Sequence, residues 1–505
     1  MAQEKKIEII SANSLDKDEL LFPDANILKG SPNKQVHLRH DEMDIFSNNA
    51  IFFQRKNKFI ATGDVFLKQG DSLELKCDSL NYDGKIKKFF SYGKVYLINN
   101  KTTLNSNELL YDRKKNVASF FNGGNIIDSL TTIQSKKGDY LLEIDKYKFR
   151  NDITITNPDY IIESESLDYI VGQEKTYFID STKITGDSYQ ITCNRGFYDG
   201  KLMKGHFLDN AKILLNERII RGDSIFFDDE MKYASATKNI SIFDRNEKLQ
   251  ILGEFAEVFE KKDSAIVTKN PVAINTSEID SLFISADTLY SVGDKENRII
   301  KGLNNVKFFK KNMSGKSDFI LINENRGLTR LIRKVLEKKE LQVMSQEQIN
   351  MINPIIWDGN SQISGDEIIL KENNETNRLD SLIVTNNGFI VEKDTLGIYN
   401  YNQIKGIKIL GKFFKGKIKS LKVDQNAEII YHMYDDDNEL IGVDKAVSSS
   451  IMITMSEKGI DKIRFITDPE GILYPEDFLD KNEKFLEGFI NRHNEKINDK
   501  SDLFE

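Results

Sequence analysis

A short motif recurs about every 30 residues from residue 60 to residue 310. Each copy has a Gly or Asn, then Val or Ile, and two residues later another apolar side chain. Successive copies are 27 to 34 residues apart. A fixed period of this size is typical of proteins whose repeats pack only against their neighbours. The clear copies are Val65/Leu67, Val95/Leu97, Ile153/Ile155, Ile213/Leu215, Ile240/Ile242, Val272/Ile274 and Val306/Phe308, with weaker copies at Ile126 and Ile184.

A second motif occupies the other half of each repeat. It has a small residue, an apolar residue three positions later and an aromatic residue two positions after that, often followed by Asp. The dipeptides Asp83-Gly84 and Asp199-Gly200 favour turns and fall between the two halves. The copies are Cys77-Leu80-Tyr82-Asp83, Ser106-Leu109-Tyr111-Asp112, Ser164-Leu167-Tyr169 and Gly222-Ile225-Phe227-Asp228, while Cys193-Gly196-Tyr198-Asp199 and Ser285-Thr288-Tyr290 lack the middle apolar residue.

Alternation of apolar and polar residues over four to eight positions predicts strands with one buried face. One repeat cannot bury such a face alone, so neighbouring repeats must stack. We therefore predict an all-β fold: an elongated stack of strands with a continuous apolar interior. An ordinary β-sandwich with evenly spaced strands is the alternative, and the number of copies in phase argues against it.

The two cysteines occupy equivalent positions of the repeat, five residues before a tyrosine. Ser106, Ser164 and Gly222 take the same position elsewhere, which indicates a slot for a small side chain at a bulge. Cys77 and Cys193 are four repeats apart, about 19 Å at one strand spacing per repeat. A disulfide needs Cα atoms within about 7 Å. We predict two free, buried thiols without a catalytic role.

The repeat fades after residue 319. Leu328, Leu331, Ile332 and Val335 have helical spacing, which predicts an amphipathic helix over residues 327–340. Strand-like runs then resume at 382–385, 389–392, 407–410, 418–423, 427–431, 450–455 and 463–466, and a short helical pattern covers 485–490. The predicted organisation is an N-terminal segment (1–34), a repeat array (35–325), a helical connector (326–352), a second β block (353–476) and a charged, partly ordered tail (477–505).

Composition excludes several classes of protein. The net charge of −8 argues against wrapping nucleic acid or binding an anionic membrane by bulk charge. Two Cys in 505 residues exclude a disulfide scaffold and a multi-Cys zinc module. No apolar window is long enough for a transmembrane helix. Met1-Ala2-Gln3 before a charged run resembles the remainder of a removed secretory signal, or else an ordinary cytosolic start.

Residues for catalysis, cofactors or metals form no recognisable set. His37 and His40 could share a face but lack a third ligand, so surface placement is favoured over zinc. The acidic run Asp435-Asp436-Asp437 lacks the spacing of an EF-hand and fits a hairpin turn better. There is no phosphate loop, dinucleotide fingerprint or nucleophile elbow. We expect a protein that is not an enzyme and uses neither cofactor nor metal.

The repeat resembles the OstA-like family, the LptA-type proteins of lipopolysaccharide transport, over roughly residues 35–490. The residues that carry the resemblance are 78–83 with 93–97, and 107–112. The stretches 401–406, 463–465, 471–476 and 485–489 are similar to a long form found in Bacteroidetes-type bacteria. The chain departs from the pattern by being about three times as long as a single-module bridge protein and by lacking an outer-membrane barrel, which leaves open whether it forms the whole bridge.

The resemblance implies a β-jelly roll in the periplasm, built as a twisted, half-open antiparallel stack, whose apolar groove carries the acyl chains of lipopolysaccharide between the inner and outer membranes. It implies partners of the LptC type at the inner membrane and the LptD type at the outer membrane, bound through open strand edges, or head-to-tail self-association. The alternating residues are the candidates for the groove lining: Leu75, Leu80, Tyr82, Val95, Leu97, Leu109, Tyr111, Ile153, Ile155, Tyr169, Tyr198, Ile213, Leu215, Phe227, Ile240 and Ile242.

Two other classes remain open from the sequence. The first is a structural or adhesive β-solenoid with a filled core, in which these same residues are ordinary core. The second is a polysaccharide-active β-helix enzyme, against which the lack of an acidic cluster on one face argues. An interior wide enough for acyl chains separates transport from the filled scaffold.

Overall fold

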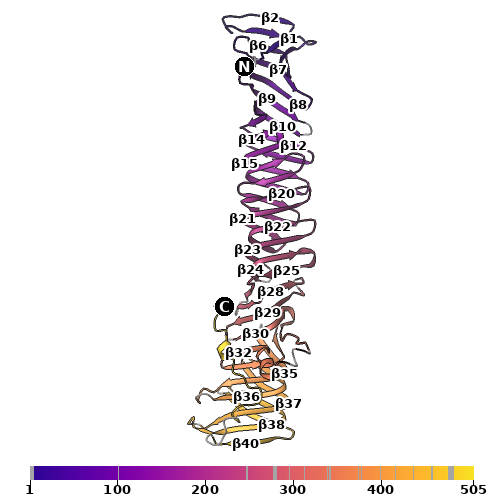
Figure 1. Cartoon of the computed structure of the whole chain (residues 1–505). Coiled ribbons are helices and arrows are strands. Elements are labelled where there is room, and N and C mark those ends of the chain that lie inside the picture. Colours follow the sequence, from indigo (N-terminus) through magenta and orange to yellow (C-terminus); the bar gives the residue numbers. More distant parts are fainter. Residues whose placement is uncertain are drawn as a thin grey trace. The chain divides into compact units, whose positions relative to one another are not determined.

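The computed structural model of the chain describes residues 5–504 apart from positions 100–101, 246–247, 277–280, 295, 312, 338, 340–342, 374, 377, 398–399, 416, 436, 457–458 and 476–482. These residues form two compact units. Unit 1 comprises Met1–Asn216 and Ile220–Met231, and unit 2 comprises Glu217–Ile219 and Lys232–Glu505. Both consist almost entirely of antiparallel strands, which confirms the predicted all-β class (Figure 1).

Unit 1 contains the first 22 strands, which follow one another along the unit in chain order (Figure 1). Their bounds are β1 (Glu8–Ser11), β2 (Ser14–Asp16), β3 (Asn26–Lys29), β4 (Val36–His40), β5 (Met43–Ser47), β6 (Asn49–Phe53), β7 (Lys58–Gln69), β8 (Leu73–Asp83), β9 (Lys88–Asn99), β10 (Thr102–Asp112), β11 (Val117–Phe120), β12 (Gly124–Asp128), β13 (Thr131–Ser135), β14 (Lys137–Leu141), β15 (Lys146–Asn157), β16 (Tyr160–Ile170), β17 (Lys175–Phe178), β18 (Thr182–Gly186), β19 (Tyr189–Cys193), β20 (Arg195–Asp199), β21 (Lys204–Leu215) and β22 (Arg218–Asp228). A short 3-10 helix, η1 (Leu142–Ile144), precedes β15.

Each long strand of unit 1 belongs to two sheets. The first half of β15 pairs with β14, whereas its second half pairs with β13. In the same way, residues 58–62 of β7 pair with β6, and residues 66–69 pair with β5. The hydrogen-bonded network therefore folds into two facing sheets. Sheet 1 contains β6, β11, β14, β17 and β20, and sheet 2 contains β5, β12, β13, β18 and β19.

The bend between the sheets has a local cause in the repeated Gly or Asn. Two successive residues with positive φ interrupt β7, β9, β15 and β21 at mid-length, at positions 63–64, 93–94, 151–152 and 209–210. The strand register shifts at these bends. Left-handed backbone is easiest for Gly, Asn and Asp, so these residue types mark the corners. The motif found in the sequence is thus the corner residue followed by the first inward residues of sheet 2.

Unit 2 repeats this construction. Its strands are β23 (Tyr233–Asp244), β24 (Leu249–Phe259), β25 (Ser264–Thr268), β26 (Val272–Thr276), β27 (Ser281–Ser285), β28 (Thr288–Val292), β29 (Ile299–Lys310), β30 (Met313–Asn323), β31 (Leu328–Ile332), β32 (Ile355–Asp358), β33 (Ser361–Ser364), β34 (Glu367–Asn373), β35 (Arg378–Lys393), β36 (Tyr401–Phe414), β37 (Lys417–Tyr434), β38 (Leu440–Ser456), β39 (Gly459–Ile466) and β40 (Glu470–Tyr474). Its helices are η2 (Glu260–Lys262), η3 (Glu324–Arg326), α2 (Gln346–Met351), η5 (His493–Glu495) and η6 (Lys500–Leu503).

The same corners and the same two sheets occur in unit 2. Pairs of positive-φ residues bend β23, β29, β35 and β37 at positions 238–239, 304–305, 386–387 and 425–426. On either side of its bend, β35 pairs with β34 in sheet 1 and with β33 in sheet 2. The strand-like runs predicted between residues 382 and 466 all lie in β35 to β39.

The predicted helix over residues 327–340 is wrong. Leu328–Ile332 is strand β31, which pairs with β30 and β34 on its two sides. Leu331 is buried in this sheet, whereas Val335, which the helix would have buried, is 86% exposed. The apolar residues of this five-residue segment fit both a helical and a strand period. Pairing with a neighbouring strand on each side makes the segment a strand. The described helix in this region is α2, which Ser345 and Gln348 cap reciprocally.

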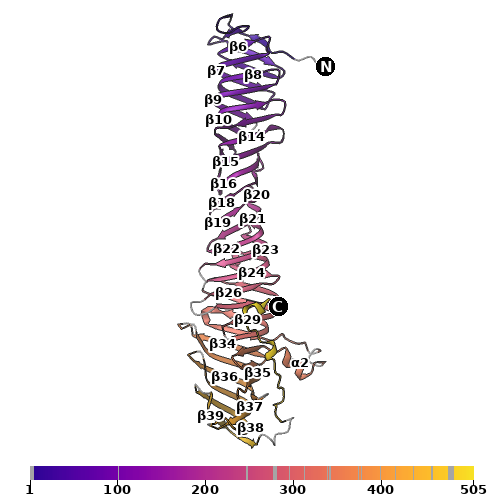
Figure 2. The same ribbon diagram turned by 90° about the vertical axis from the view of Figure 1, so that its left-hand side faces the viewer.

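The tail also differs from expectation. Residues 485–490 form no helix, and residues 483–504 lie on the outer face of unit 2, where the yellow segment in Figure 2 runs from β36 past α2 towards β29. Leu486, Ile497 and Leu503 are buried there. We call residues 483–504 the strap. The domain boundaries expected at 35, 326, 353 and 477 stay predictions, because the division into two compact units does not test them.

Cys77 and Cys193 are free and buried, as predicted. Cys77 lies where β8 shifts register at its bend, which confirms the small-residue slot at a bulge. Burial raises the pKa of each thiol to about 12. The thiolate is the reactive form of cysteine, so both side chains are held inert at neutral pH.

Candidate functional site

All sixteen candidate lining residues lie between the two sheets. Fourteen are in unit 1, and Ile240 and Ile242 are in unit 2. The structure brings them into one interior per unit, and none is more than 3% exposed. Side chains buried to this degree pack against each other as a protein core. Their contact with lipid therefore stays a prediction, and it requires the sheets to separate.

One column of this interior is aromatic and sits at the ends of the sheet 1 strands. Its members are 29 residues apart: Tyr82, Tyr111, Tyr140, Tyr169 and Tyr198. Each is at most 2% exposed. Tyr140 was missed in the sequence because its repeat has Gly138 in place of the middle apolar residue and Leu141 in place of the following Asp, although Ser135 and the 29-residue spacing from Tyr111 were usable signals. We call this set the tyrosine column.

Apart from the hydroxyl of Tyr111, which donates to Asn116, the hydroxyl groups of the column reach across to sheet 2 at the edge of the interior opposite the bends, which we call the mouth. Tyr169 donates to Asp128 over 2.9 Å, and the Asn99 side chain donates to the Tyr140 hydroxyl over 2.7 Å. The hydroxyls of Tyr198 and Tyr189 are 3.0 Å apart. A hydrogen bond of this kind stabilises a fold by about 1 kcal/mol, and more when the acceptor is charged. The mouth of unit 1 is therefore fastened by polar contacts between the sheets.

His40 and Tyr82 continue this fastening near the start of the unit. The His40 ring has Nδ1 2.6 Å from the Tyr82 hydroxyl and Nε2 3.0 Å from the Lys5 carbonyl. A carbonyl only accepts, so Nε2 carries the hydrogen and Nδ1 accepts from Tyr82. Arg113 donates to the same hydroxyl over 2.9 Å and to Gln69 over 3.0 Å. Burial lowers the pKa of His40, which favours this neutral ring.

The interior is looser in the last part of unit 2. A cavity of about 50 Å³ lies between the two sheets there. Sheet 2 contributes Ile363, Ile390, Ile404 and Ile429, and sheet 1 contributes Leu421 and Ile453. At the mouth side Ile418, Met455 and Ile460 line the cavity and are half-buried. The cavity has the volume of one or two water molecules, so an acyl chain enters it only if the sheets move apart.

Four polar side chains of sheet 2 border this cavity: Ser361, Glu392, Asn402 and Tyr431. Burial raises the pKa of Glu392 and of Tyr431, which keeps both closer to their neutral forms. A mainly apolar cavity with a polar rim is suited to an apolar chain that carries a polar head group. Sequence patterns predicted strands in this region, but they gave no reason to expect the site here rather than in the repeat array.

Unit 2 ends in two strands that each have β38 as their neighbour. β39 pairs with residues 450–456 of β38 in sheet 1, and β40 pairs with residues 443–447 in sheet 2. Within the described part of the chain, the outer edges of β39 and β40 have no strand beside them. Unit 1 begins similarly, with β1 on β4 and β2 on β3. Such edges expose backbone groups that can pair with another chain.

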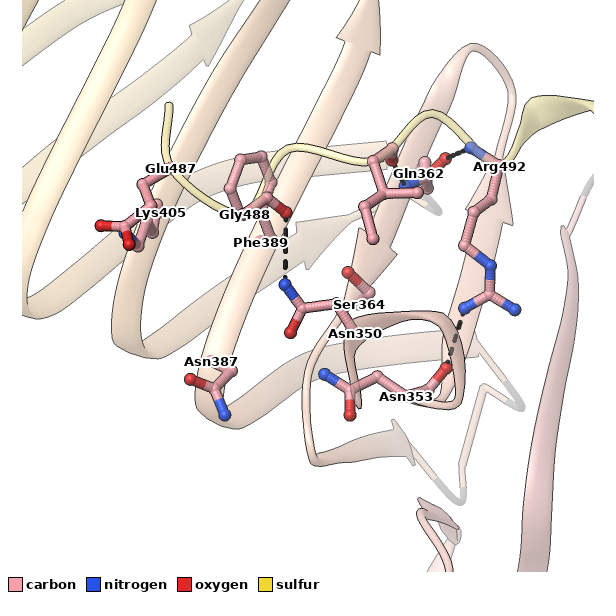
Figure 3. A pocket seen from close by; sticks show the side chains of 11 residues that line it. Asn350, Asn353, Gln362, Ser364, Asn387, Phe389, Lys405, Glu487, Gly488 and Arg492 are labelled. Carbon is pink, nitrogen blue, oxygen red and sulfur yellow. Dashed lines mark hydrogen bonds between the residues drawn. The ribbon is translucent and has the colours of Figure 1, made fainter. Parts of the chain in front are cut away.

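A second hollow, of about 200 Å³, lies outside the sheets, beneath the strap (Figure 3). Its wall is polar, and several of its polar groups form hydrogen bonds with one another. Gln362 accepts from the Arg492 backbone over 2.7 Å, Arg492 donates to the Asn353 carbonyl over 3.0 Å, and Asn350 donates to the Gly488 carbonyl over 3.4 Å. These bonds, dashed in Figure 3, fasten the strap to β33 and to the residues around α2.

The other singled-out residues have structural partners. His37 lies 2.6 Å from a carboxylate oxygen of Asp44. Asp435 accepts from the backbone of Asp437 and Glu439 in the β37–β38 hairpin, which confirms the turn predicted for the acidic run. Over the residues that the structure describes, no group of three His, Cys, Asp or Glu side chains is arranged to hold a metal. In the same residues, no helix is long and apolar enough to cross a membrane.

Comparison with known proteins gives one match. Residues 4–165 match the family described as OstA-like protein. No curated protein matches the chain. The matched region contains most of the tyrosine column and the first bends, and the same corner geometry continues beyond it to residue 426. Residues 4–165 therefore form an OstA-like domain.

Proposed function

We propose that the protein is a non-enzymatic carrier in the periplasm that holds the acyl chains of lipopolysaccharide between its two sheets on their way from the inner to the outer membrane. The observation that carries the proposal is the apolar interior of an OstA-like, two-sheet roll, which runs through each unit and loosens into a cavity beside Met455. Apolar burial favours binding by about 25 cal/mol per Å² of covered surface.

Entry of a lipid requires the sheets to part along the mouth. In unit 1 this means breaking the bonds of the tyrosine column, each worth about 1 kcal/mol. Near the cavity of unit 2 the mouth is lined by half-buried apolar side chains such as Ile418 and Ile460. We therefore place the easiest entry in unit 2.

The free edges support a role as a link between proteins. We propose that β1 and β2 at one end, and β39 and β40 at the other, add to the sheets of LptC-type and LptD-type partners, or to a second copy of the chain. Strand addition satisfies the exposed backbone groups and extends the interior across the junction.

A structural scaffold with a filled core is the second candidate function. The burial of all sixteen candidate residues of the repeat array favours it. The two functions differ in whether the interior opens in the cell, because a scaffold has no reason to admit lipid.

Photo-crosslinking in living cells separates the two. A photoreactive amino acid is placed at Met455 at the cavity, at Leu97 in the packed interior, or at Ile144, which is 60% exposed on the outside. Transport predicts lipopolysaccharide adducts at Met455, weaker adducts at Leu97 and none at Ile144. Adducts at none of the interior positions, in correctly folded variants, would leave the scaffold as the function.

A further inference from the structure

The last strand of sheet 2 is weakly held by its own contacts. β40 has five residues, of which Glu470, Gly471, Ile472 and Leu473 are exposed and Tyr474 is half-buried. Ile472 and Leu473 are 56% and 51% exposed. Burial of apolar area is what normally retains a strand, and β40 buries little of it. Pro475 follows directly and ends the ladder, because proline has no N–H to donate.

The strand beneath it is firmly held. β38 has 17 residues and pairs along most of its length with β37. Under β40, Val443 and Ala446 of β38 are only 3% and 5% exposed. Loss of β40 would leave residues 443–447 of β38 as a stable, partly apolar edge with its backbone groups free.

The strap contributes to the apolar cluster against which β40 packs through Tyr474. Tyr474 packs on a cluster formed by Phe389, Val391, Ile430, Val443 and Leu486, in which Leu486 belongs to the strap and Phe489 adds to it. The strap is held to sheet 2 by buried amide side chains that hydrogen-bond to the backbone of the strap.

These amides are two glutamines. The Gln403 side chain donates to the Lys484 carbonyl over 2.9 Å and accepts from the Leu486 N–H over 2.8 Å. Gln362 does the same with the Ile490 carbonyl, at 2.8 Å, and with the Arg492 N–H, at 2.7 Å. Both side chains are at most 2% exposed. Loosening of these four bonds would free the strap, and with it Leu486, from the apolar cluster against which Tyr474 packs.

We propose that β40 is an exchangeable strand and the strap its latch: the edge of β38 at residues 443–447 is a docking site at which an edge strand of a partner β-roll replaces β40. This deepens the proposed function, on which it rests, by assigning the partner to the position now taken by β40 rather than to the outer edge of β40.

The site also sets a requirement on the partner strand. Gly471 lies opposite Ala446, and a Cβ atom built on Gly471 would be 2.9 Å from the Ala446 Cβ. That separation is below normal contact, so glycine is required there unless the strands shift. The expected partner is an extended segment of about five residues with glycine near its start and apolar residues after it.

The test uses the full chain and a synthetic peptide of residues 467–475 with photoreactive benzoylphenylalanine in place of Ile472. Exchange predicts labelling of residues 443–447 of β38. Gln403→Ala, which loosens the latch, should increase the labelling roughly tenfold, the effect of about 1.4 kcal/mol. Gln134→Ala, which alters an exposed glutamine of β13, should leave it unchanged.

Disulfide locks keep the test decisive if the Gln403 variant folds poorly. Lys445→Cys with Ile472→Cys joins paired residues of β38 and β40, and should abolish labelling until a reductant is added. Thr454→Cys with Lys462→Cys joins β38 to β39 instead and should leave labelling intact. Equal labelling of the β40-locked chain, or none in any variant, would overturn the proposal. Neither result depends on lipid adducts at Met455, so transport and strand exchange are judged separately.

Discussion

The bond between Tyr169 and Asp128 gives the sharpest test of how the mouth is fastened. Asp128 is 2% exposed and accepts two hydrogen bonds of 2.9 Å, from the Tyr169 hydroxyl and from the Gly172 N–H. Tyr169→Phe removes one of them and changes the packed volume by one oxygen atom. A hydrogen bond to a charged group is worth about 1.5–3 kcal/mol, so unit 1 should lose about that much stability.

Hydrogen exchange measures this loss where it occurs. Amides of β12 and β16 should lose protection roughly 10- to 100-fold, at 1.4 kcal/mol per factor of ten. Trp357, the only tryptophan, is buried in unit 2, so its fluorescence midpoint in urea should stay unchanged. Tyr177→Phe is the matched control, because Tyr177 lies on β17 and is 44% exposed. Unchanged protection in Tyr169→Phe, or an equal loss in both variants, would refute a fastened mouth.

Three further predictions test the interior. Val95→Asp buries an unpaired carboxylate where the side chain is 1% exposed, and should destabilise unit 1 by about 4 kcal/mol or abolish folding, whereas Tyr96→Asp on the outer face should have little effect, as judged by hydrogen exchange of the β9 amides. The thiols of Cys77 and Cys193, with pKa raised to about 12, should react with a thiol reagent at neutral pH only after unfolding; rapid reaction of native protein would contradict their burial. Burial raises the pKa of Glu392, so its protonated form is more favoured in the folded state than in the unfolded state, and stability should fall as the pH rises above the ordinary pKa of Glu, about 4.3. Glu392→Gln should therefore stabilise unit 2 at pH 7 and much less at about pH 4, as judged by Trp357 fluorescence; an equal effect at both values would show that Glu392 titrates normally.

The all-β class, the period and the free, buried thiols were predicted from the sequence, whereas the bends have a local signal in the repeated Gly or Asn that was not recognised as a corner. Each depends on local chemistry that repeats in phase. Alternation fixes which side chains share a face, and Gly, Asn or Asp fix where left-handed backbone is possible. The candidate interior was found for the same reason, since an inward residue stays inward in every copy. Tyr140 shows the limit of the method, because a copy with altered neighbours drops out of a motif although its position is kept.

Only the tertiary structure decided whether the interior is closed, where it loosens and what covers the last strand. Leu328–Ile332 became a strand because β30 and β34 offered pairing on both sides. The bond of Tyr169 to Asp128 joins residues 41 positions apart, and the bonds of Gln403 to the strap join residues about 80 apart. Such contacts leave no local pattern, because they depend on how two sheets meet in space and on the volumes that fill the gap between them.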